Sequence, residues 1–156
     1  MQLTEAKKRG MQIYKQISSY VKRGRLAGSI RRNKPFVRHI DIVIELKPDN
    51  LDNLKKCLEE IGNIKLKGDK LIRFITFDNT QVDIYIATKE NYEPLLLIRT
   101  GSKEHNIKLT TRALSMNMQL TANGLINEKT GRIIATSEKD IFRMLKMNYV
   151  EPQNRN

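Results

Sequence analysis

The stretch Gly28-Ser29-Ile30-Arg31-Arg32, continued by Val37-Arg38-His39-Ile40-Asp41, decides what this chain is built around. A Gly-Ser turn allows backbone amides to approach a phosphate closely, and the adjacent arginines supply positive charge. Asp41 opens the apolar strand pattern that follows, where a carboxylate could hold a divalent cation against the same phosphate. The stretch therefore predicts a phosphate-binding turn followed by an acidic strand.

A second acidic residue, Asp83, lies inside the apolar pattern Gln81-Val82-Asp83-Ile84-Tyr85. Aspartate is unfavourable within a strand, which favours a metal role over the alternative that Asp41 is a strand-end residue and Asp83 a solvated one. Neighbouring strands lie about 4.8 Å apart, so both carboxylates could share one ion. These are the parts of a nucleotidyl-transfer site, and they predict Mg²⁺ as the cofactor.

His39 occupies the position two residues before Asp41, where such a site usually has another acid. As a neutral imidazole it would suit Mn²⁺ or Zn²⁺ better than Mg²⁺, as a cation it would attract phosphate, and it could also be inert. We take Asp41, Asp83 and His39 as the candidate catalytic and metal-binding residues, with Mn²⁺ as the alternative ion. Gly28, Ser29 and Arg32 are the candidate phosphate contacts, whereas Arg31 could equally be a surface charge.

Positive charge is concentrated at the start of the chain. The net charge is +12, and residues 1–38 hold eleven Lys and Arg against the single acid Glu5. Clustered positive charge favours association with nucleic acid. We expect DNA contacts along the first helix, at Lys7, Lys8, Arg9 and Lys15, with a merely solvated basic helix as the alternative.

No apolar run approaches the roughly 20 residues that span a bilayer, and the first residues lack a signal-peptide pattern. We therefore expect no membrane partner. The single cysteine, Cys57, excludes an internal disulfide, which suits a reducing cytoplasm or nucleoid, or a viral or phage setting. We expect a monomer.

Apolar spacing and turn residues predict an α+β fold with a short meander. The expected helices span 4–22, 48–61, 102–116 and 137–146, the expected strands span 40–46, 64–67, 71–77 and 82–87, and a hairpin is expected over 125–134. Residues 92–94 read as a junction between lobes and 95–98 as an apolar run. His105, alone on a helix, is expected at the surface.

At this spacing the motifs resemble the X family of DNA polymerases, the DNA polymerase beta-like nucleotidyltransferases. The matching segments are the Gly28–Arg32 turn, the Asp41 and Asp83 strands, Thr100-Gly101-Ser102, Asn123-Gly124-Leu125, and Ser137–Phe142 with Tyr149 and Glu151-Pro152. The resemblance implies a palm domain over residues 1–90, with a mixed or antiparallel sheet and two helices, and a small α+β thumb domain over residues 91–156. It leaves no room for the lyase and helix-hairpin-helix lobes.

The resemblance also implies DNA, as primer-template or gapped duplex, and a dNTP as partners. It adds Arg38, Ile98, Arg99, Thr100, Gly101 and Asn106 to the candidate nucleotide contacts, and Arg112 to the candidate DNA contacts. Two departures stand out. His39 replaces the first metal aspartate of the family, and Ile98-Arg99 replaces an aromatic pair that helps to exclude a ribose 2′-hydroxyl.

The sequence thus predicts a small gap-filling DNA polymerase that works by two-metal nucleotidyl transfer. His39 motivates a second hypothesis, a nucleic-acid- or nucleotide-binding relative with impaired catalysis. Ile98-Arg99 motivates a third, an untemplated or ribonucleotide-adding transferase.

Overall fold

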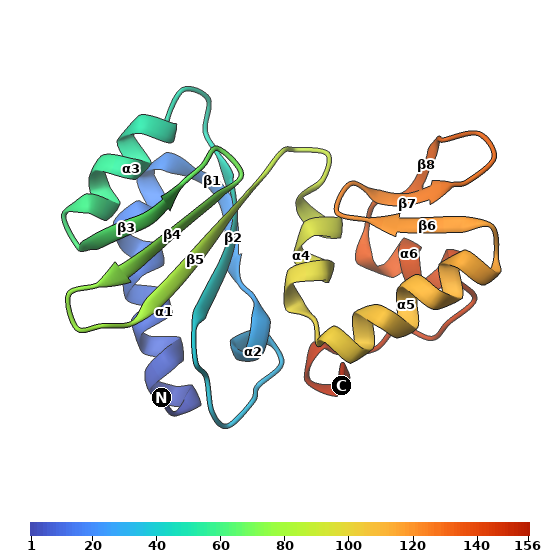
Figure 1. Cartoon of the computed structure of the whole chain (residues 1–156), viewed down its shortest axis with the longest axis horizontal. Helices are drawn as coiled ribbons and strands as arrows, with labels where there is room; N and C mark the ends of the chain where they lie inside the picture. The colour runs from blue at the N-terminus through green and yellow to red at the C-terminus, as the bar shows by residue number, and fades with distance from the viewer.

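A mixed five-stranded sheet forms the first part of the molecule in the computed structural model, which describes all residues, 1–156 (Figure 1). The strand order is β1 (Val21–Leu26), β2 (Ile40–Leu46), β5 (Gln81–Ala87), β4 (Leu71–Thr76) and β3 (Gly62–Lys67). Only β2 and β5 run parallel, and the other neighbours are antiparallel. Antiparallel neighbours suit the short turns between β3, β4 and β5, whereas the parallel pair needs the longer connection that carries α3 (Leu51–Glu59).

Two helices cover one face of this sheet. Helix α1 (Leu3–Ile17), which continues into the 3₁₀ turn η1 (Ser18–Tyr20), and helix α3 pack on Ile40, Ile42 and Ile44 of β2 and on apolar residues of β4 and β5. Side chains alternate along a strand, so the intervening residues of β2, β4 and β5 face the other side. The second face is therefore free to carry polar groups.

Helix α4 (Tyr92–Thr100) covers part of that second face. Its Leu95 and Leu96 pack with Val43 and Ala87 of the sheet, while Leu97 belongs to the core of the remaining residues. One short helix thus contributes to both hydrophobic cores. The even shorter α2 (Gly28–Arg31) lies on the connection from β1 to β2.

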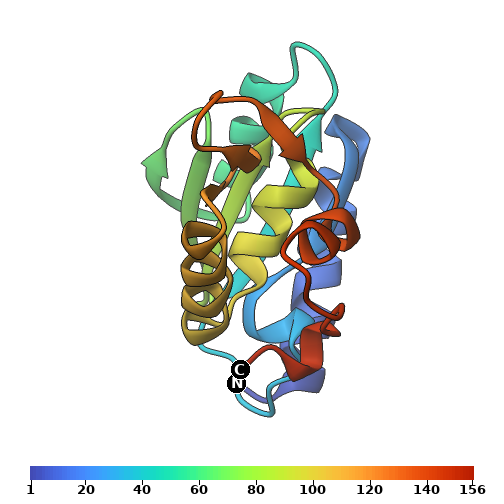
Figure 2. The same cartoon turned by 90° about the vertical axis from the view of Figure 1, so that its right-hand side faces the viewer.

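The second lobe has its own sheet and core. It comprises α5 (Lys103–Ser115), β6 (Met118–Thr121), β7 (Gly124–Asn127), β8 (Ile133–Ala135), α6 (Glu138–Met144) and the 3₁₀ turn η2 (Pro152–Asn154). The three strands form an antiparallel sheet in sequence order, and α5 and α6 lie on either side of α4 when viewed from this end (Figure 2). Ser102 and Ser137 cap α5 and α6 through their hydroxyl oxygens.

The α+β class is confirmed, but four elements differ from the sequence prediction. The first helix ends at Ile17 instead of residue 22, and Val21–Leu26 forms the edge strand β1. Its Lys-Arg-Gly-Arg run lacks apolar alternation because the strand is largely exposed, so only pairing with β2 defines it. The apolar run after residue 91 is helix α4, and Met118–Thr121 adds a strand to the predicted hairpin. None of the helices has the length and apolar character that a membrane crossing requires.

Candidate active site

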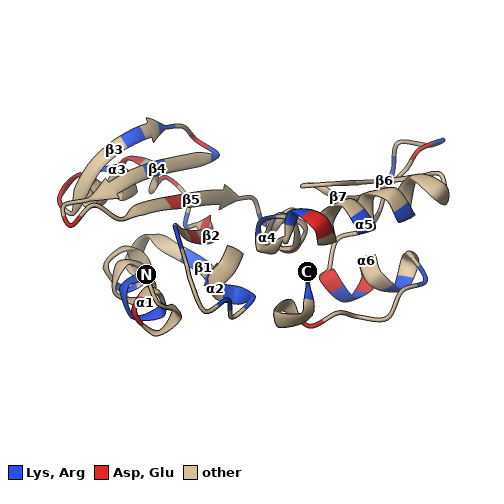
Figure 3. Cartoon of the chain, turned by 60° about the horizontal axis from the view of Figure 1, so that its bottom comes forward, with Lys and Arg blue, Asp and Glu red and all other residues tan.

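Asp41 and Asp83 lie side by side on the second face of the large sheet. They are register partners on the parallel strands β2 and β5, so both carboxylates project from the same face. The acidic bands on these neighbouring strands are visible in Figure 3. The structure therefore brings together the two carboxylates that the sequence placed on separate strands.

Asp83 is buried and already held by a cation. Arg73 on the neighbouring strand β4 donates from Nε to Oδ1 at 2.8 Å and from Nη2 to Oδ2 at 3.0 Å. Gln81 adds a weaker contact to Oδ1 at 3.3 Å. A bidentate Arg–carboxylate pair fixes both oxygens of Asp83 in orientation. Sequence reasoning missed Arg73, whose role shows only in the cross-strand register Arg73↔Asp83.

Asp41 lacks such a partner, because its carboxylate accepts no hydrogen bond within the chain. Burial, with repulsion from Asp83, raises the pKa of Asp41 to about 6, although Arg99, Arg32 and Arg73 oppose the rise. The ionised form of Asp41 is thus short of compensating positive charge. A cation beside it would supply that charge.

Gly28 stands directly against Asp41. Its φ is +56°, and a β-carbon there would collide with the Asp41 carboxylate. The Ala27 amide also donates to the Asp41 carbonyl at 2.8 Å. The Gly-Ser turn is therefore held against the acidic strand, and only glycine fits at its first position.

Two further arginines approach this face from the turn and from α4. Arg32 donates to the carbonyl of Thr100 and lies beside Gly101, and burial lowers its pKa. Arg99 stacks over the Tyr85 ring at 4.3 Å from its centroid. The structure thus gathers the candidate residues Gly28, Arg32, Asp41, Asp83, Arg99, Thr100 and Gly101 between the large sheet and α4.

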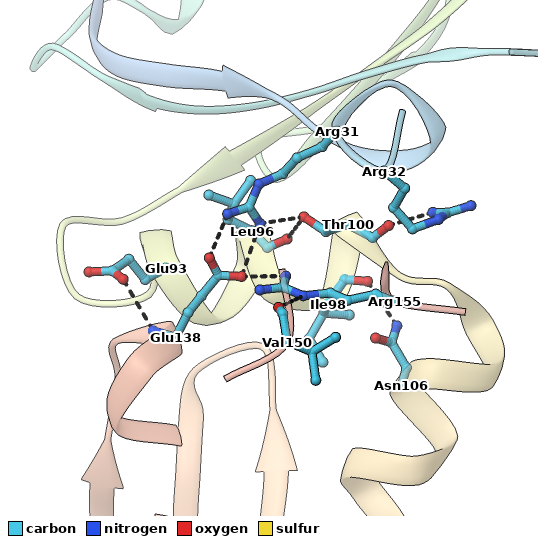
Figure 4. A network of polar contacts seen from close by, with 10 residues as sticks. All are labelled: Arg31, Arg32, Glu93, Leu96, Ile98, Thr100, Asn106, Glu138, Val150 and Arg155. Carbon is cyan, nitrogen blue, oxygen red and sulfur yellow. Dashed lines mark hydrogen bonds and ion pairs between the residues drawn. The ribbon is translucent and has the colours of Figure 1, made fainter. Parts of the chain in front are cut away.

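Arg31, for which the sequence left two readings, is a buried connection between the lobes (Figure 4). Its guanidinium donates to both oxygens of Glu138, at 2.9 and 2.6 Å, and to the Thr100 hydroxyl at 2.7 Å. The fully buried Arg155 donates to Glu138 at 2.7 Å. Residues more than 100 positions apart meet here, so no local sequence signal marks Glu138 or Arg155.

The remaining candidate contacts on α4 and α5 are partly engaged within the chain. Asn106 donates to the carbonyl of Ile98 at 2.9 Å, and its Oδ1 is buried without a partner. His105 is buried against Phe142 instead of lying at the surface, which corrects the sequence prediction. Burial lowers the pKa of His105 to about 4, so it is neutral near pH 7.

Arg38 and His39 are exposed in the loop before β2, and neither side chain makes a hydrogen bond or ion pair within the chain. No group of three His, Cys, Asp or Glu side chains lies close enough to hold a metal ion. The structure therefore does not gather His39 with Asp41 and Asp83. The donor set that fits a divalent cation is the pair of carboxylates, whose hard oxygens suit Mg²⁺ or Mn²⁺.

The candidate DNA contacts lie elsewhere. Lys7, Lys8 and Lys15 are exposed on α1, which covers the sheet face opposite to the carboxylates. Arg9, on the same helix, is engaged with Glu5, Asp78 and Thr80. In the second lobe, Arg112 donates to the carbonyl of Leu145 at 3.0 Å.

Known proteins resemble this chain over both parts. A family model described as DNA polymerase beta thumb matches residues 95–156. The DNA polymerase/3'-5' exonuclease PolX of Bacillus subtilis is 30% identical over 135 residues, which cover 83% of this chain and 23% of the relative. The DNA nucleotidylexotransferase of Xenopus laevis is 31% identical over 125 residues, which cover 69% of this chain and 23% of the relative. The chain spans about a quarter of the length of these relatives.

Two solved structures share the fold over the whole chain. Both are ternary complexes of Leishmania infantum polymerase beta, with TM-scores of 0.87 and 0.88 and 18% sequence identity. The match covers 76% and 70% of the length of these two structures and 100% of this chain. With the carboxylate pair, the glycine turn and the thumb match taken together, the chain resembles the X family of DNA polymerases, the DNA polymerase beta-like nucleotidyltransferases, over its whole fold, and its residues 95–156 match the thumb of that family.

Proposed function

We propose that this protein is a small DNA-directed DNA polymerase of the gap-filling type, which adds a dNMP to a primer 3′-hydroxyl. One observation carries the proposal: Asp41 and Asp83 are register partners, and Asp41 lies directly against the Gly28 turn. The matched relatives include a DNA polymerase, and the structural neighbours are ternary complexes, one of them with a gap. Residues 1–90 would act as the palm and residues 91–156 as the thumb.

The chain's own residues would position the triphosphate. The amides of the Gly28-Ser29 turn can approach phosphate oxygens, and Arg32 would give up its contact with the Thr100 carbonyl for them. Arg38, Ile98, Arg99, Gly101 and Asn106 remain the proposed further contacts around the nucleotide. Asn106 presents a buried acceptor, Oδ1, that no group of the chain satisfies.

Asp41 and Asp83 would hold Mg²⁺ or Mn²⁺. When bound, the ions would lower the pKa of the primer 3′-hydroxyl and neutralise the charge that develops on the triphosphate. Arg73 keeps the Asp83 carboxylate oriented for this role. Asp41 would gain the positive charge that its half-buried carboxylate lacks.

The direct test is incorporation of dNTPs into a one-nucleotide gap, measured separately with Mg²⁺ and Mn²⁺. The wild-type protein is expected to extend the primer, and Asp41→Asn and Asp83→Asn to abolish extension while keeping the fold by circular dichroism. Asp140→Asn, a partly exposed acid on α6, is the matched control. A folded wild-type protein inactive with both ions would contradict the proposal.

His39 supports a second candidate, a binding protein with impaired catalysis, because this side chain is not gathered with Asp41 and Asp83. Restoring the acid distinguishes the two. His39→Asp should create incorporation where the wild type shows none, whereas efficient incorporation by the wild type would exclude this candidate.

Similarity to DNA nucleotidylexotransferases favours a third candidate, untemplated addition. The experiment compares single-stranded with gapped primers, each with dNTPs and with NTPs. Extension of the single-stranded primer, or use of NTPs, would support this candidate, and a strict need for a templated dNTP would remove it.

A further inference from the structure

The basic residues of the first 38 positions fall into two classes. Several are neutralised within the chain: Arg9 by Glu5 and Asp78, Lys22 and Arg23 by Glu45, and Arg31 by Glu138. By contrast, the exposed side chains of Lys7, Lys8, Lys15 and Arg25 make no ion pair or hydrogen bond. Their charge is therefore available to an external anion.

These four unpaired cations lie around Met11 and Tyr14 of α1. A hollow of about 400 Å³ on one side includes Lys7 and Arg25 in its lining, and a second of about 540 Å³ includes Lys8 and Lys15. Both hollows share Met11 and Tyr14, and neither is lined by an acidic residue. We call this surface the α1–β1 strip. Figure 3 shows α1, β1 and α2, each with basic positions, next to one another.

The edge strand β1 shapes the strip. A β-carbon at Gly24 would strike the Tyr14 ring, so glycine is needed for the ring to lie against the strand. Met11, with 56% of its surface exposed, adds a second apolar side chain beside it. The result is an aromatic and thioether surface flanked by unpaired cations.

We propose that the α1–β1 strip binds single-stranded DNA, with phosphates on its cations and bases on Tyr14 and Met11. Single strands are held in this way, by charge that follows the backbone and by aromatic stacking that tolerates any base. The first hollow is also lined by Ile30 and Arg31 of α2, whose first residue contacts Asp41, so a strand here could continue toward the candidate active site. The inference rests on the proposed DNA function but concerns a different face of the sheet.

The first test measures binding without metal or dNTP. Fluorescence anisotropy of a labelled twelve-residue oligo(dT) is followed over a series of salt concentrations, for wild type and for the double variant Lys7→Gln/Arg25→Gln. Because each lost phosphate contact lowers the salt slope by about 0.7 for single strands, the slope should fall by about 1.4 and the affinity by about tenfold.

The control removes the same charge from the second lobe. Lys129→Gln/Arg132→Gln changes exposed residues of the β7–β8 turn, and its affinity should stay within about twofold of wild type. Equal losses in both double variants would show nonspecific attraction by net charge and would overturn the proposal.

The apolar part of the strip is tested by two substitutions. Tyr14→Leu should weaken oligo(dT) binding about five- to hundredfold with an unchanged salt slope, as loss of stacking predicts. Met11→Glu places an acid on an exposed position that the fold does not need, so it should abolish binding without affecting stability. Wild-type binding by a folded Met11→Glu variant would overturn the proposal.

Two further measurements separate this surface from its rivals. The protein should not bind vesicles that contain anionic lipid. If it does bind them, and Lys7→Gln/Arg25→Gln weakens vesicle binding as much as it weakens oligo(dT) binding, the DNA assignment is overturned. Primer extension is scored in parallel. If the strip variants lose oligo(dT) binding, the proposed single-strand site is supported even when no nucleotide is incorporated. If the wild-type protein extends primers and the strip variants bind oligo(dT) normally, only the proposed single-strand site is wrong.

Discussion

At the scale of single residues, Gly28 carries a requirement that no other residue type meets. It combines a positive φ with direct contact to the Asp41 carboxylate. Gly131 has a comparable φ, +71°, but nothing lies within 4 Å of an added β-carbon. Substitutions at Gly28 and Gly131 can therefore distinguish the cost of backbone strain from the cost of a steric collision.

Gly28→Ala should lower the free energy of unfolding by about 2–3 kcal/mol and weaken dNTP binding, because the methyl group displaces Asp41 in addition to straining the backbone. Gly131→Ala should cost only about 1–2 kcal/mol, from strain alone, with normal binding. Urea unfolding and dNTP titration measure both effects. Equal costs at the two positions would show that the contact with Asp41 is unimportant.

Arg73 is the other decisive single residue, because it occupies both oxygens of Asp83. Arg73→Gln removes a competing positive charge, so Mn²⁺ should bind about tenfold more tightly, a change of about 1.4 kcal/mol. Electron paramagnetic resonance of free Mn²⁺ measures this without catalysis. Arg143→Gln, which changes an exposed arginine on α6, should leave the affinity unchanged. Weaker binding by Arg73→Gln would mean that orientation of Asp83 outweighs the competition.

At the scale of elements, α2, α4, α6 and the C-terminal turn meet at Glu138. The carboxylate is buried, and burial alone would raise its pKa, but hydrogen bonds and charge from Arg31 and Arg155 outweigh that effect and lower it. Glu138 also receives support from Glu93, which accepts from its backbone amide at 3.1 Å. One acid thus compensates two buried arginines from different elements.

Glu138→Gln should destabilise the protein by about 3–5 kcal/mol, because two buried guanidinium groups lose their counter-ion. Glu151→Gln, an exposed acid in the same tail, should cost less than about 0.5 kcal/mol. Denaturant unfolding of both variants decides the matter. A change below about 1 kcal/mol for Glu138→Gln would indicate that water or another acid replaces the pair.

At the scale of the whole molecule, stability should depend on pH through His105. Its folded pKa, about 4, lies below the unfolded value of 6.5. Between pH 6.5 and 4 the unfolded state therefore binds a proton at this histidine that the folded state does not bind. The His105 contribution to stability should therefore fall as pH drops from 6.5 to 4, by up to about 3 kcal/mol. Asp41 acts in the opposite direction below pH 6, because its folded pKa of about 6 lies above its ordinary value of 3.8. Below pH 4.5, Glu138 adds a further loss because its folded pKa is lowered from that ordinary value.

His105→Leu isolates this contribution. Compared with wild type, the variant should lose less unfolding free energy between pH 6.5 and 4, while the opposing Asp41 contribution and the Glu138 effect below pH 4.5 remain. Neither ring nitrogen has a hydrogen-bond partner, so leucine breaks no bond. An unchanged slope in that window would show that His105 is accessible to protons in the folded protein.

Several features could be predicted from sequence because they have local causes. The apolar runs of β2 and β5 predict buried strands. Aspartate within such a strand is energetically unfavourable, so its presence there indicates a functional site. Serine caps placed α5 and α6 to within a residue or two. By contrast, β1 was missed because an exposed edge strand needs no apolar alternation, and α4 because a short apolar run fits a helix or a strand equally well.

The sequence by itself determined the α+β class, the glycine turn beside Asp41 and the excess of positive charge in residues 1–38. Only the tertiary structure decided which charges are free. Arg9, Arg31 and Arg73 face acids brought to them by folding, whereas Lys7 and Arg25 face none. The reason is physical: helix and strand propensities act over a few residues, but the partner of a charge depends on packing between segments up to 122 positions apart.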